Sequence, residues 1–342
     1  YALAHDDAFY LSADSLEAND DLWDLVKKLQ AHHGIRTLLL DEIHFLPDAT
    51  GFLKRLYDFL ELRVIFTSSV ALAMQASAHD LSRRVVLKQL LNFSFREYLA
   101  FKKDIVLPLV KLPDLLEGRW TSEHLRQGIH FNDYLKGEQL PFSLEEPEPL
   151  VLLRSIQDKV IYRDVPSVLR LAVEEIEILK RLIRFAGLSD VDGINYSSLS
   201  QNLGITKYKA EQYVRCLERA FILFQVFPAG TNVLREPKVL LAPPYRLLYR
   251  DFPESLGGLR EDYFVQAAKQ AGIDVHYLKS TRGKKTPDFL VELDKEKLAI
   301  EIGGKGKGRE QFKGVKVDRK VIFAHMDVPD NKRYPLFLLG YL

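Results

Sequence analysis

The sequence predicts an α/β protein, with a parallel sheet at the N-terminal end, a helical middle and a second α/β region at the C-terminal end. The first observation behind this prediction is the apolar run at 37–40, which leads directly into Asp41 and Glu42. A continuous apolar run is typical of a strand buried on both faces, as in parallel sheets. The second observation is that apolar strands alternate with amphipathic helices over residues 1–69, which is the order of a right-handed parallel sheet.

The elements of this first region follow one another closely. We expect a strand over 1–7 that runs into acids, a helix over 20–32, the buried strand over 37–42, a helix over 52–60 opened by Gly51, and a strand over 63–69 that ends in hydroxyls. Ligands of open α/β sheets bind outside the carboxyl ends of the strands, so Asp41 and Glu42 are candidates for a site. The alternative is a buried strand that ends in two solvated acids.

Length and composition limit the number of domains and the class of protein. The 342 residues suggest two or three domains, and the 47% hydrophobic and 28% charged residues are ordinary for a globular protein. No apolar run reaches the ~20 residues of a membrane span, and no secretory signal is visible. The single cysteine, Cys216, excludes an intramolecular disulfide, lies in an apolar helical pattern that indicates the core, and suggests the cytoplasm. No residues have the spacing of a zinc site or define a Ser–His–Asp arrangement.

The net charge of +1 hides an asymmetry along the chain. Residues 1–61 contain 12 acids and 5 bases, whereas residues 279–320 contain 13 bases and 7 acids. The basic end is suited to contact nucleic acid, and the alternative is an ordinary solvated surface.

Four short motifs appear in order at close spacing: 38–42, the hydroxyl run 67–69, Leu-Ser-Arg-Arg at 81–84 and Phe-Ser-Phe-Arg-Glu-Tyr-Leu at 93–99. Together they resemble a widespread bacterial and archaeal family of AAA-type ATPases with a C-terminal domain of unknown function. The resemblance implies that Asp41 and Glu42 are the Walker B pair, in which the first acid holds Mg²⁺ and the second orients the attacking water.

The same resemblance implies two further groups in the first region. Ser68 or Ser69 would be the polar sensor at the next strand end. Arg84 would be the arginine of the family's Gly-Arg element, although Arg83 stands where glycine is usual. Arginines of this type often act across a subunit boundary, so the resemblance also implies self-association.

The main departure from the family concerns the phosphate loop. The sequence contains no G-x-x-x-x-G-K-[ST] motif, whose backbone amides and lysine hold the phosphates of ATP. Two explanations follow: an earlier segment precedes Tyr1, or the protein does not hydrolyse ATP. The abrupt start favours the first, so ATP and Mg²⁺ are ligands that the resemblance implies for the parent protein.

The middle of the chain is expected to be helical. Residues 104–172 read as helices and connections, either a lid over the nucleotide or packing between domains. Residues 173–245 read as a winged helix in which Thr206 caps the third helix. That helix carries the polar residues Lys207, Lys209, Gln212, Arg215 and Arg219. A basic exposed helix after a glycine turn can enter a DNA major groove, and many such modules bind protein surfaces instead.

The last region resembles the PD-(D/E)xK nuclease-like fold, with Glu261 near the start of a helix over 261–271, Asp288 after a proline and Glu301 on a strand. In active members the Asp and Glu hold Mg²⁺ for water activation. The lysine expected two residues after the Glu is replaced by Gly303. Lys305, or Lys307, could reach in from the glycine loop at 303–308, or that loop could bind nucleic-acid phosphates or be solvated.

These observations predict four domains: an AAA-like core over 1–103, a connector over 104–172, a winged helix over 173–245 and a nuclease-like domain over 246–342. We expect an ATP-binding switch coupled to C-terminal domains that bind nucleic acid or protein, with ATP hydrolysis by the full-length protein and no nuclease cleavage. The alternative is a nucleic-acid-binding module, or a Mg²⁺-dependent nuclease, with a degenerate ATPase domain.

Overall fold

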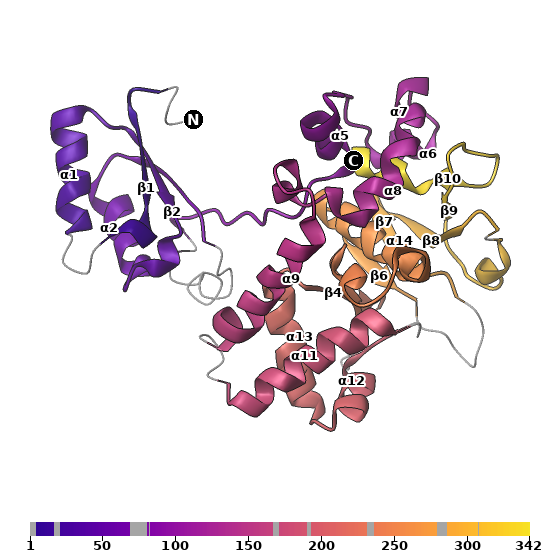
Figure 1. Cartoon of the computed structure of the whole chain (residues 1–342). Helices are drawn as coiled ribbons and strands as arrows, with labels where there is room; N and C mark the ends of the chain where they lie inside the picture. The colour runs from indigo at the N-terminus through magenta and orange to yellow at the C-terminus, as the bar shows by residue number, and fades with distance from the viewer. Residues whose placement is uncertain are drawn as a thin grey trace. The chain divides into compact units, whose positions relative to one another are not determined.

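Residues 5–16, 21–68, 81, 83–166, 171–189, 193–230, 236–278, 286–306 and 308–342 are described by a computed structural model (Figure 1). The chain divides into two units, Tyr1–Gln89 and Leu90–Leu342. Each unit has its own sheet.

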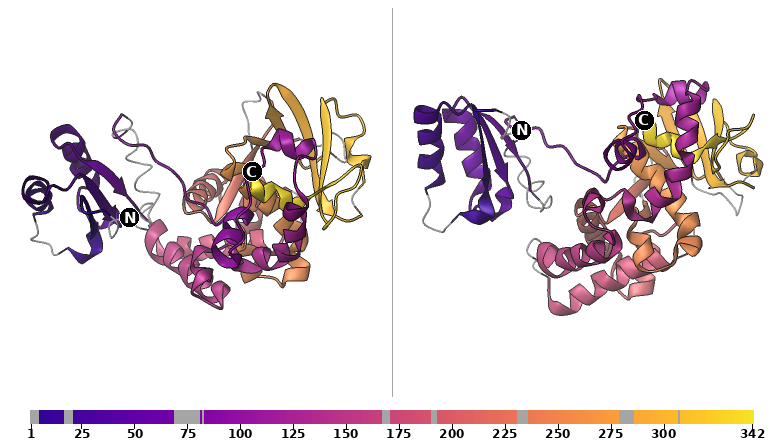
Figure 2. Two further views of the ribbon diagram at one scale, coloured as in Figure 1. Left: turned by 90° about the horizontal axis from the view of Figure 1, so that it is seen from above. Right: turned by 45° about the horizontal axis from the view of Figure 1, so that its top comes forward.

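The first unit is a three-stranded parallel sheet with two helices. Strands β1 (Ala8–Ser12), β2 (Thr37–Asp41) and β3 (Arg63–Phe66) lie in that order and are linked by α1 (Leu22–His33) and α2 (Ala49–Phe59). Right-handed crossovers between consecutive parallel strands place the linking helices on one face of the sheet. Figure 2 shows both helices on the same side of the strands. The predicted parallel α/β order of this region is therefore confirmed.

The first strand lies later in the chain than the sequence pattern indicated. It was expected over 1–7, but residues 5–7 form no strand and residues 1–4 lie outside the described part. The carbonyl oxygen of Asp7 accepts hydrogen bonds from the amides of Arg36 (2.8 Å) and Thr37 (3.0 Å). Pairing with β2 thus begins just after Asp7, and the strand follows it.

The expectation that β2 is buried on both faces is wrong for the described residues. Leu38 and Leu40 are buried beneath the helices, with Val26 of α1 and Leu53 of α2 in the same core. Leu39 is only half-buried on the opposite face. Its neighbours in the sheet there are Tyr10 and Ile65, which are 54% and 42% exposed. Side chains alternate between the faces of a strand, so covering one face buries only every second residue.

The second unit combines many helices with a mixed sheet. Its helices are α5 (Phe95–Lys103), α6 (Leu112–Leu116), α7 (Ser122–Arg126), α8 (Phe131–Asp133), α9 (Pro149–Lys159), α11 (Val173–Leu188), α12 (Tyr196–Leu203), α13 (Lys207–Arg219) and α14 (Phe252–Gln270). Its strands are β4 (Leu223–Pro228), β5 (Lys238–Leu241), β6 (Val275–Tyr277), β7 (Phe289–Leu293), β8 (Glu296–Gly304), β9 (Arg319–His325) and β10 (Tyr334–Pro335). Among the described residues, no helix is both long and apolar enough to cross a membrane.

The seven strands form one sheet in the order β10-β9-β8-β7-β6-β4-β5. Strand β4 pairs antiparallel with β5 through its first residues and parallel with β6 through its last. The strands of the expected winged-helix and nuclease-like regions are therefore continuous. The mixed α/β character, with a helical segment before the sheet-rich end, agrees with the predicted fold class.

Helix α14 is longer than the sequence pattern indicated. It was expected to begin at Glu261, but it begins at Phe252, so Glu261 lies in its middle. Pro253 occupies the first turn, where its missing N–H costs nothing. The helix runs through the pair Gly257–Gly258. Gly258 is needed there because a Cβ would lie 2.4 Å from the guanidinium carbon of Arg246.

The Ser-Phe-Arg-Glu-Tyr-Leu run forms α5 and belongs to the second unit. Ser94 and Glu97 form a capping box at its start. Phe95 and Tyr98 are fully buried, and the ring of Phe95 lies 5.8 Å from that of Tyr341 near the C-terminus. The predicted boundary at 103/104 falls after this helix, whereas the two units divide before it. The four-domain division stays a prediction.

Candidate functional site

The carboxyl end of β2 brings Asp41 beside two side chains from neighbouring strands. The Asp41 carboxylate accepts hydrogen bonds from the hydroxyl of Tyr10 on β1 (2.8 Å), from the hydroxyl of Thr67 just after β3, and from the amide of Glu42 (3.1 Å). Hydrogen bonds to the charged form favour it. The bond from Thr67, followed by those from Tyr10 and Glu42, lowers the pKa of Asp41, so this carboxylate is ionised at neutral pH.

Glu42 has a left-handed backbone, with φ of 51°. This conformation is uncommon for a residue other than glycine, and it persists where neighbouring contacts impose it. Here the Glu42 amide donates to the Thr67 hydroxyl (3.3 Å) and the next amide, that of Ile43, donates to the Thr67 carbonyl (3.1 Å). The carboxylate of Glu42 lies 3.2 Å from the imidazole of His44. The turn thus separates the two acids and places Glu42 beside a half-buried histidine.

The other predicted groups of this unit lie in different surroundings. The Ser68 hydroxyl is buried and has no hydrogen-bond partner among the described residues, and Ser69 lies outside them. It is Thr67 whose hydroxyl donates to Asp41. Arg84 forms two hydrogen bonds to Asp58 on α2, at 2.9 and 3.1 Å. The roles of Ser68, Ser69 and Arg84 stay predictions.

The donor set at β2 suits Mg²⁺. This ion binds in proteins through one or two carboxylates and completes its shell with water and phosphate oxygens. Asp41 supplies an ionised carboxylate and Thr67 a neighbouring hydroxyl oxygen. Among the described residues, no three His, Cys, Asp or Glu side chains are grouped to hold a metal. Asp41 would therefore hold the ion only together with water and phosphate oxygens, as in an ATPase.

The second predicted constellation comes together in the C-terminal unit. Glu261 from α14, Asp288 just before β7 and Glu301 on β8 lie close enough for their charges to interact. The Asp288 carboxylate accepts a hydrogen bond from the amide of Ile302 (2.7 Å), and Glu301 is buried. Burial, with the nearby charges of Glu261 and Glu301, raises the pKa of Asp288 to about 7. The charges of three carboxylates thus interact in one region, but among the described residues these side chains are not grouped to hold a metal.

The lysine of this constellation is not the one that the sequence suggested. Lys238 on β5 places its ammonium 2.5 Å from Glu261, and its side chain is only 10% exposed. Lys305 lies 3.7 Å from Asp327, where both side chains are well exposed. Lys307 lies outside the described residues. The structure therefore brings Lys238, and not Lys305, to the carboxylates.

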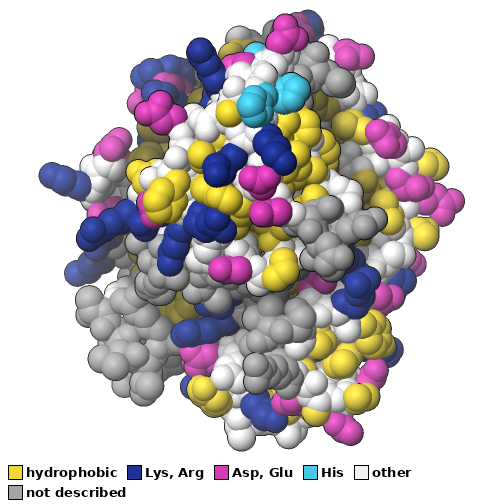
Figure 3. Space-filling model, turned by 90° about the vertical axis from the view of Figure 1, so that its left-hand side faces the viewer, with side chains coloured by type: hydrophobic (Ala, Val, Ile, Leu, Met, Phe, Trp, Pro, Cys, Tyr) yellow, Lys and Arg dark blue, Asp and Glu magenta, His cyan; other side chains and the backbone are white. Residues whose placement is uncertain are grey.

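The polar residues of α13 are largely engaged within the protein. Lys207 forms an ion pair with Glu236, Lys209 with Glu175 of α11 (2.8 Å), and Arg215 with Glu211 (2.6 Å). The side-chain amide of Gln212 donates to the hydroxyl of Tyr208 (2.8 Å). Figure 3 shows basic and acidic side chains interspersed on one face of the molecule. Of the five predicted residues, Arg219 is the one for which no ion pair or hydrogen bond was found in the described part of the chain.

Sequence patterns did not identify Tyr10, Thr67 or Lys238 as members of a site. Thr67 stood in the recognised hydroxyl run, and its place at the strand end was a signal in its favour. Tyr10 and Lys238 reach their partners across 31 and 23 residues of chain, at Asp41 and Glu261. Nothing in local spacing points to such pairs.

Two families match parts of the chain. Residues 2–99 match the AAA domain family, and residues 143–243 match a domain of unknown function, DUF8612. The first match contains the strand end with Asp41 and Glu42. The second extends from just before α9 to just after β5.

Two individual proteins are also similar. An uncharacterised protein of Methanocaldococcus jannaschii, MJ1637, is 28% identical over 353 aligned residues, which cover 92% of this chain and 73% of that protein. The Orc1 protein of Aeropyrum pernix, whose structure was solved in complex with DNA, is 16% identical and covers 76% of this chain and 78% of its own, with a TM-score of 0.30. A TM-score this low carries no argument about the fold or the function of this chain. The part of the chain that matches the AAA domain family, residues 2–99, contains the three parallel strands and Asp41 at the end of β2.

Proposed function

We propose that this protein is a nucleotide-dependent switch, in which Mg-ATP bound at the AAA domain changes the binding of nucleic acid by the second unit. The observation that carries the proposal is the strand end where Asp41 and Glu42 lie beside Thr67. A Walker B strand contributes two acids to nucleotide chemistry. At this strand end, Asp41 is an ionised carboxylate that can bind a cation, and the left-handed turn at Glu42 points the second carboxylate away from Asp41.

Each residue has a separate task in this proposal. Bound Mg²⁺ would offset the charge of the phosphate oxygens. Asp41 binds the cation, and Tyr10 and Thr67 keep its carboxylate ionised and oriented. Glu42 accepts a hydrogen bond from the attacking water and orients it, with His44 fixing the carboxylate from the other side at 3.2 Å. The G-x-x-x-x-G-K-[ST] motif is absent from these 342 residues, so the proposal assigns none of them to the phosphates.

For the second unit, we propose that α11, α12 and α13 with the β4–β5 pair act as a winged helix. The supporting observation is the order of three helices followed by an antiparallel pair. On α13, Arg215 and Arg219 are the cations that would contact phosphates. Because Lys207, Lys209 and Arg215 already pair with acids, we expect modest rather than tight affinity for nucleic acid.

A second function, Mg²⁺-dependent chemistry on nucleic acid, is favoured by a separate observation. Glu261, Asp288 and Glu301 lie together with Lys238, which is the set of side chains that a metal-dependent phosphodiesterase uses. We rank it lower because Lys238 is bound to Glu261, so its ammonium is not directed at an open position.

The switch is tested on the whole natural protein by measuring retention of a short DNA duplex with and without Mg-ATP. We expect Mg-ATP to change retention in the wild type, and Asp41→Asn to weaken Mg²⁺-dependent ATP binding about tenfold or more. Glu42→Gln should keep binding but lower hydrolysis by about a hundredfold. Glu61→Gln, an exposed acid of the same unit, is the matched control.

Charge reversal at Arg215 and Arg219 should reduce retention at low salt more than at high salt. Two outcomes count against the proposal. If Asp41→Asn and Glu61→Gln bind Mg-ATP alike, the strand end is not the nucleotide site. If charge reversal leaves retention unchanged, α13 does not contact nucleic acid.

A further inference from the structure

A cavity of about 310 Å³ lies between α14, β5 and the end of β8. Its walls include Lys238 on β5, Arg246, Arg260 on α14 and the glycine pair Gly303–Gly304. The cavity borders the carboxylate cluster through Glu261 but extends away from it along α14. Its size is at the lower end of the range for small-molecule pockets in proteins.

The cations of this cavity differ in burial and in how they are neutralised: Lys238 and Arg246 are buried, and Arg260 is half-buried. Arg246 forms a two-bond ion pair with Asp262, at 2.8 and 3.2 Å, and both side chains are buried. Lys238 is paired with Glu261. Arg260 has no hydrogen bond or ion pair with any described residue, and its buried Nε atom has no acceptor. Burial lowers the pKa of Arg260, and no acid offsets this effect.

An unpaired guanidinium in such a place is energetically unfavourable. Arg260 is half-buried, and removing even part of a charge from water is unfavourable unless a counter-charge or hydrogen bonds compensate. Arginine stays protonated under these conditions because its unperturbed pKa exceeds 12. The fold therefore holds a cation whose natural counter-charge is not supplied by the described residues. A ligand with negative charge would supply it.

The glycine pair keeps space open beside this cation. A Cβ at Gly304 would lie 3.4 Å from Arg260 Nη1, so any side chain there would fill the position next to the guanidinium. The amide of Ile302 points to the edge of β8 where it meets Asp288 (2.7 Å). Alternate residues of a strand direct their amides to the same edge, so the amide of Gly304 points the same way.

The neighbouring His325 adds no competing charge. It is the register partner of Gly304 on β9, and burial followed by the charge of Arg260 lowers its pKa to about 4. The imidazole is therefore neutral at pH 7, and its buried Nδ1 has no hydrogen-bond partner among the described residues. Lys305 adds to this lowering, and Asp327 opposes it.

We infer that this cavity binds a phosphate group, with Arg260 as the cationic anchor. A guanidinium donates two parallel hydrogen bonds to a pair of phosphate oxygens. The phosphate can belong to a free monoester or to the phosphorylated end of a nucleic-acid strand, since both present the same group. Hydrolysis in the AAA domain is not required.

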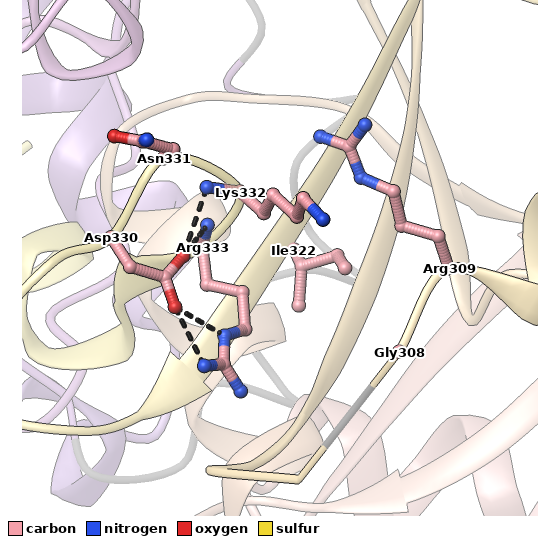
Figure 4. Close-up of a pocket in the computed structure, with 7 residues that line it drawn as sticks. All are labelled: Gly308, Arg309, Ile322, Asp330, Asn331, Lys332 and Arg333. Carbon is pink, nitrogen blue, oxygen red and sulfur yellow. Dashed lines mark hydrogen bonds and ion pairs between the residues drawn. The ribbon is translucent and has the colours of Figure 1, made fainter.

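A second basic hollow in the same unit is a weaker candidate. Figure 4 shows Arg309 and Lys332 extending over Ile322, whereas Arg333 turns back to Asp330. Arg309 and Lys332 are exposed, so water already solvates their charges. This hollow therefore provides the matched control: Arg309 is also an arginine without an ion pair among the described residues, but at the surface.

The test is titration of the protein with inorganic phosphate and with AMP, in Mg²⁺-free buffer, by calorimetry. We expect binding that Arg260→Gln weakens about tenfold or more, whereas Arg309→Gln and Asp41→Asn leave it unchanged. A short oligonucleotide with and without a 5′-phosphate distinguishes the two sources: preference for the phosphorylated strand assigns the site to a strand end, and equal weak binding of both assigns it to free monoesters.

Two further readouts separate a ligand site from a structural arginine. Arg260→Met, which removes a half-buried charge without a counter-charge among the described residues, should leave the melting temperature of the ligand-free protein unchanged or higher. Phosphate should raise the pKa of His325, followed by NMR, because it neutralises Arg260. The inference is overturned if the wild type binds neither phosphate nor AMP, if Arg260→Gln binds as well as the wild type, or if Arg260→Met lowers the melting temperature.

Discussion

Asp288 shows how the fold changes the chemistry of one side chain. In an unfolded chain the pKa of the Asp288 carboxyl group would be near 3.8. In the folded protein, burial and the charges of Glu261 and Glu301 raise this pKa to about 7. Between these two values the folded protein binds a proton that the unfolded chain releases. Stability from this group is therefore fully present below about pH 4 and is lost as the pH rises towards 7.

Replacing Asp288 by asparagine should remove this pH dependence. The amide is neutral at every pH and its oxygen can still accept the hydrogen bond from the Ile302 amide. Each pKa unit corresponds to ~1.4 kcal/mol, so a shift of about three units sets an upper limit of about 4 kcal/mol on the effect. We expect the unfolding free energy to fall less between pH 5 and pH 8 in Asp288→Asn than in the wild type.

The measurement is urea denaturation at both pH values in the presence of a chelator. Asp294→Asn is the matched control, because Asp294 lies exposed in the turn between β7 and β8. Equal pH dependence in Asp288→Asn and the wild type would show that Asp288 is not the group responsible.

Among the helices, α14 shows why local pattern and tertiary packing disagree. Glycine lowers helix propensity, so the pair Gly257–Gly258 weakens the helix locally. The structure instead uses Gly258 as a point of close approach, where the guanidinium of Arg246 crosses the helix to reach Asp262. The loss of propensity is offset by a buried ion pair that a larger residue would prevent.

This contrast predicts opposite effects for two neighbouring substitutions. A Cβ at Gly257 would meet nothing within 4 Å, so Gly257→Ala should stabilise the protein by ~0.5–1 kcal/mol through propensity. At Gly258 a Cβ would displace Arg246, and separating a buried pair costs ~3–5 kcal/mol, so Gly258→Ala should be destabilising overall. Chemical denaturation of both variants checks this. Similar stability changes in the two would rule out the packing role of Gly258.

Across the whole chain, each of the two units has a core of its own. Leu56 of α2 is buried among apolar side chains of the first unit, and Phe95 of α5 is buried among the aromatic rings of the second. The Ser-Phe-Arg-Glu-Tyr-Leu run, recognised by its resemblance to an ATPase family, therefore serves the packing of the C-terminal unit. Its aromatic residues contribute core contacts, and its Ser94 and Glu97 cap the helix.

Truncating each core should destabilise one unit selectively. We expect Leu56→Ala to lower the stability of residues 1–89 by ~2–5 kcal/mol and Phe95→Ala to lower that of residues 90–342 by ~3–5 kcal/mol. Hydrogen exchange resolved along the chain reports the two effects separately. Faster exchange throughout both units in either variant would mean that the chain unfolds as one cooperative body, contrary to this prediction.

The sequence alone was sufficient to predict helices and strands that depend on residues close together in the chain. The strand that ends in Asp41 and Glu42, the two helices around it and the buried face of α13 all follow from apolar spacing and caps, because those depend on residues a few positions apart. The match of residues 2–99 to the AAA domain family agrees with the resemblance predicted from four short motifs in this region. The prediction of a first strand over 1–7 was wrong because hydrogen-bond pairing with β2, and not a run of apolar residues alone, decides where a strand begins.

Groups that meet across long stretches of chain needed the tertiary structure. Tyr10 and Thr67 hold Asp41, Lys238 replaces the expected lysine beside Glu261, and Arg260 is left without a counter-charge in a cavity. Each of these depends on which side chains the sheet and helices bring together and on how far they are removed from water. Spacing along the sequence carries the periodicity of an element, but burial and charge pairing arise only when elements pack.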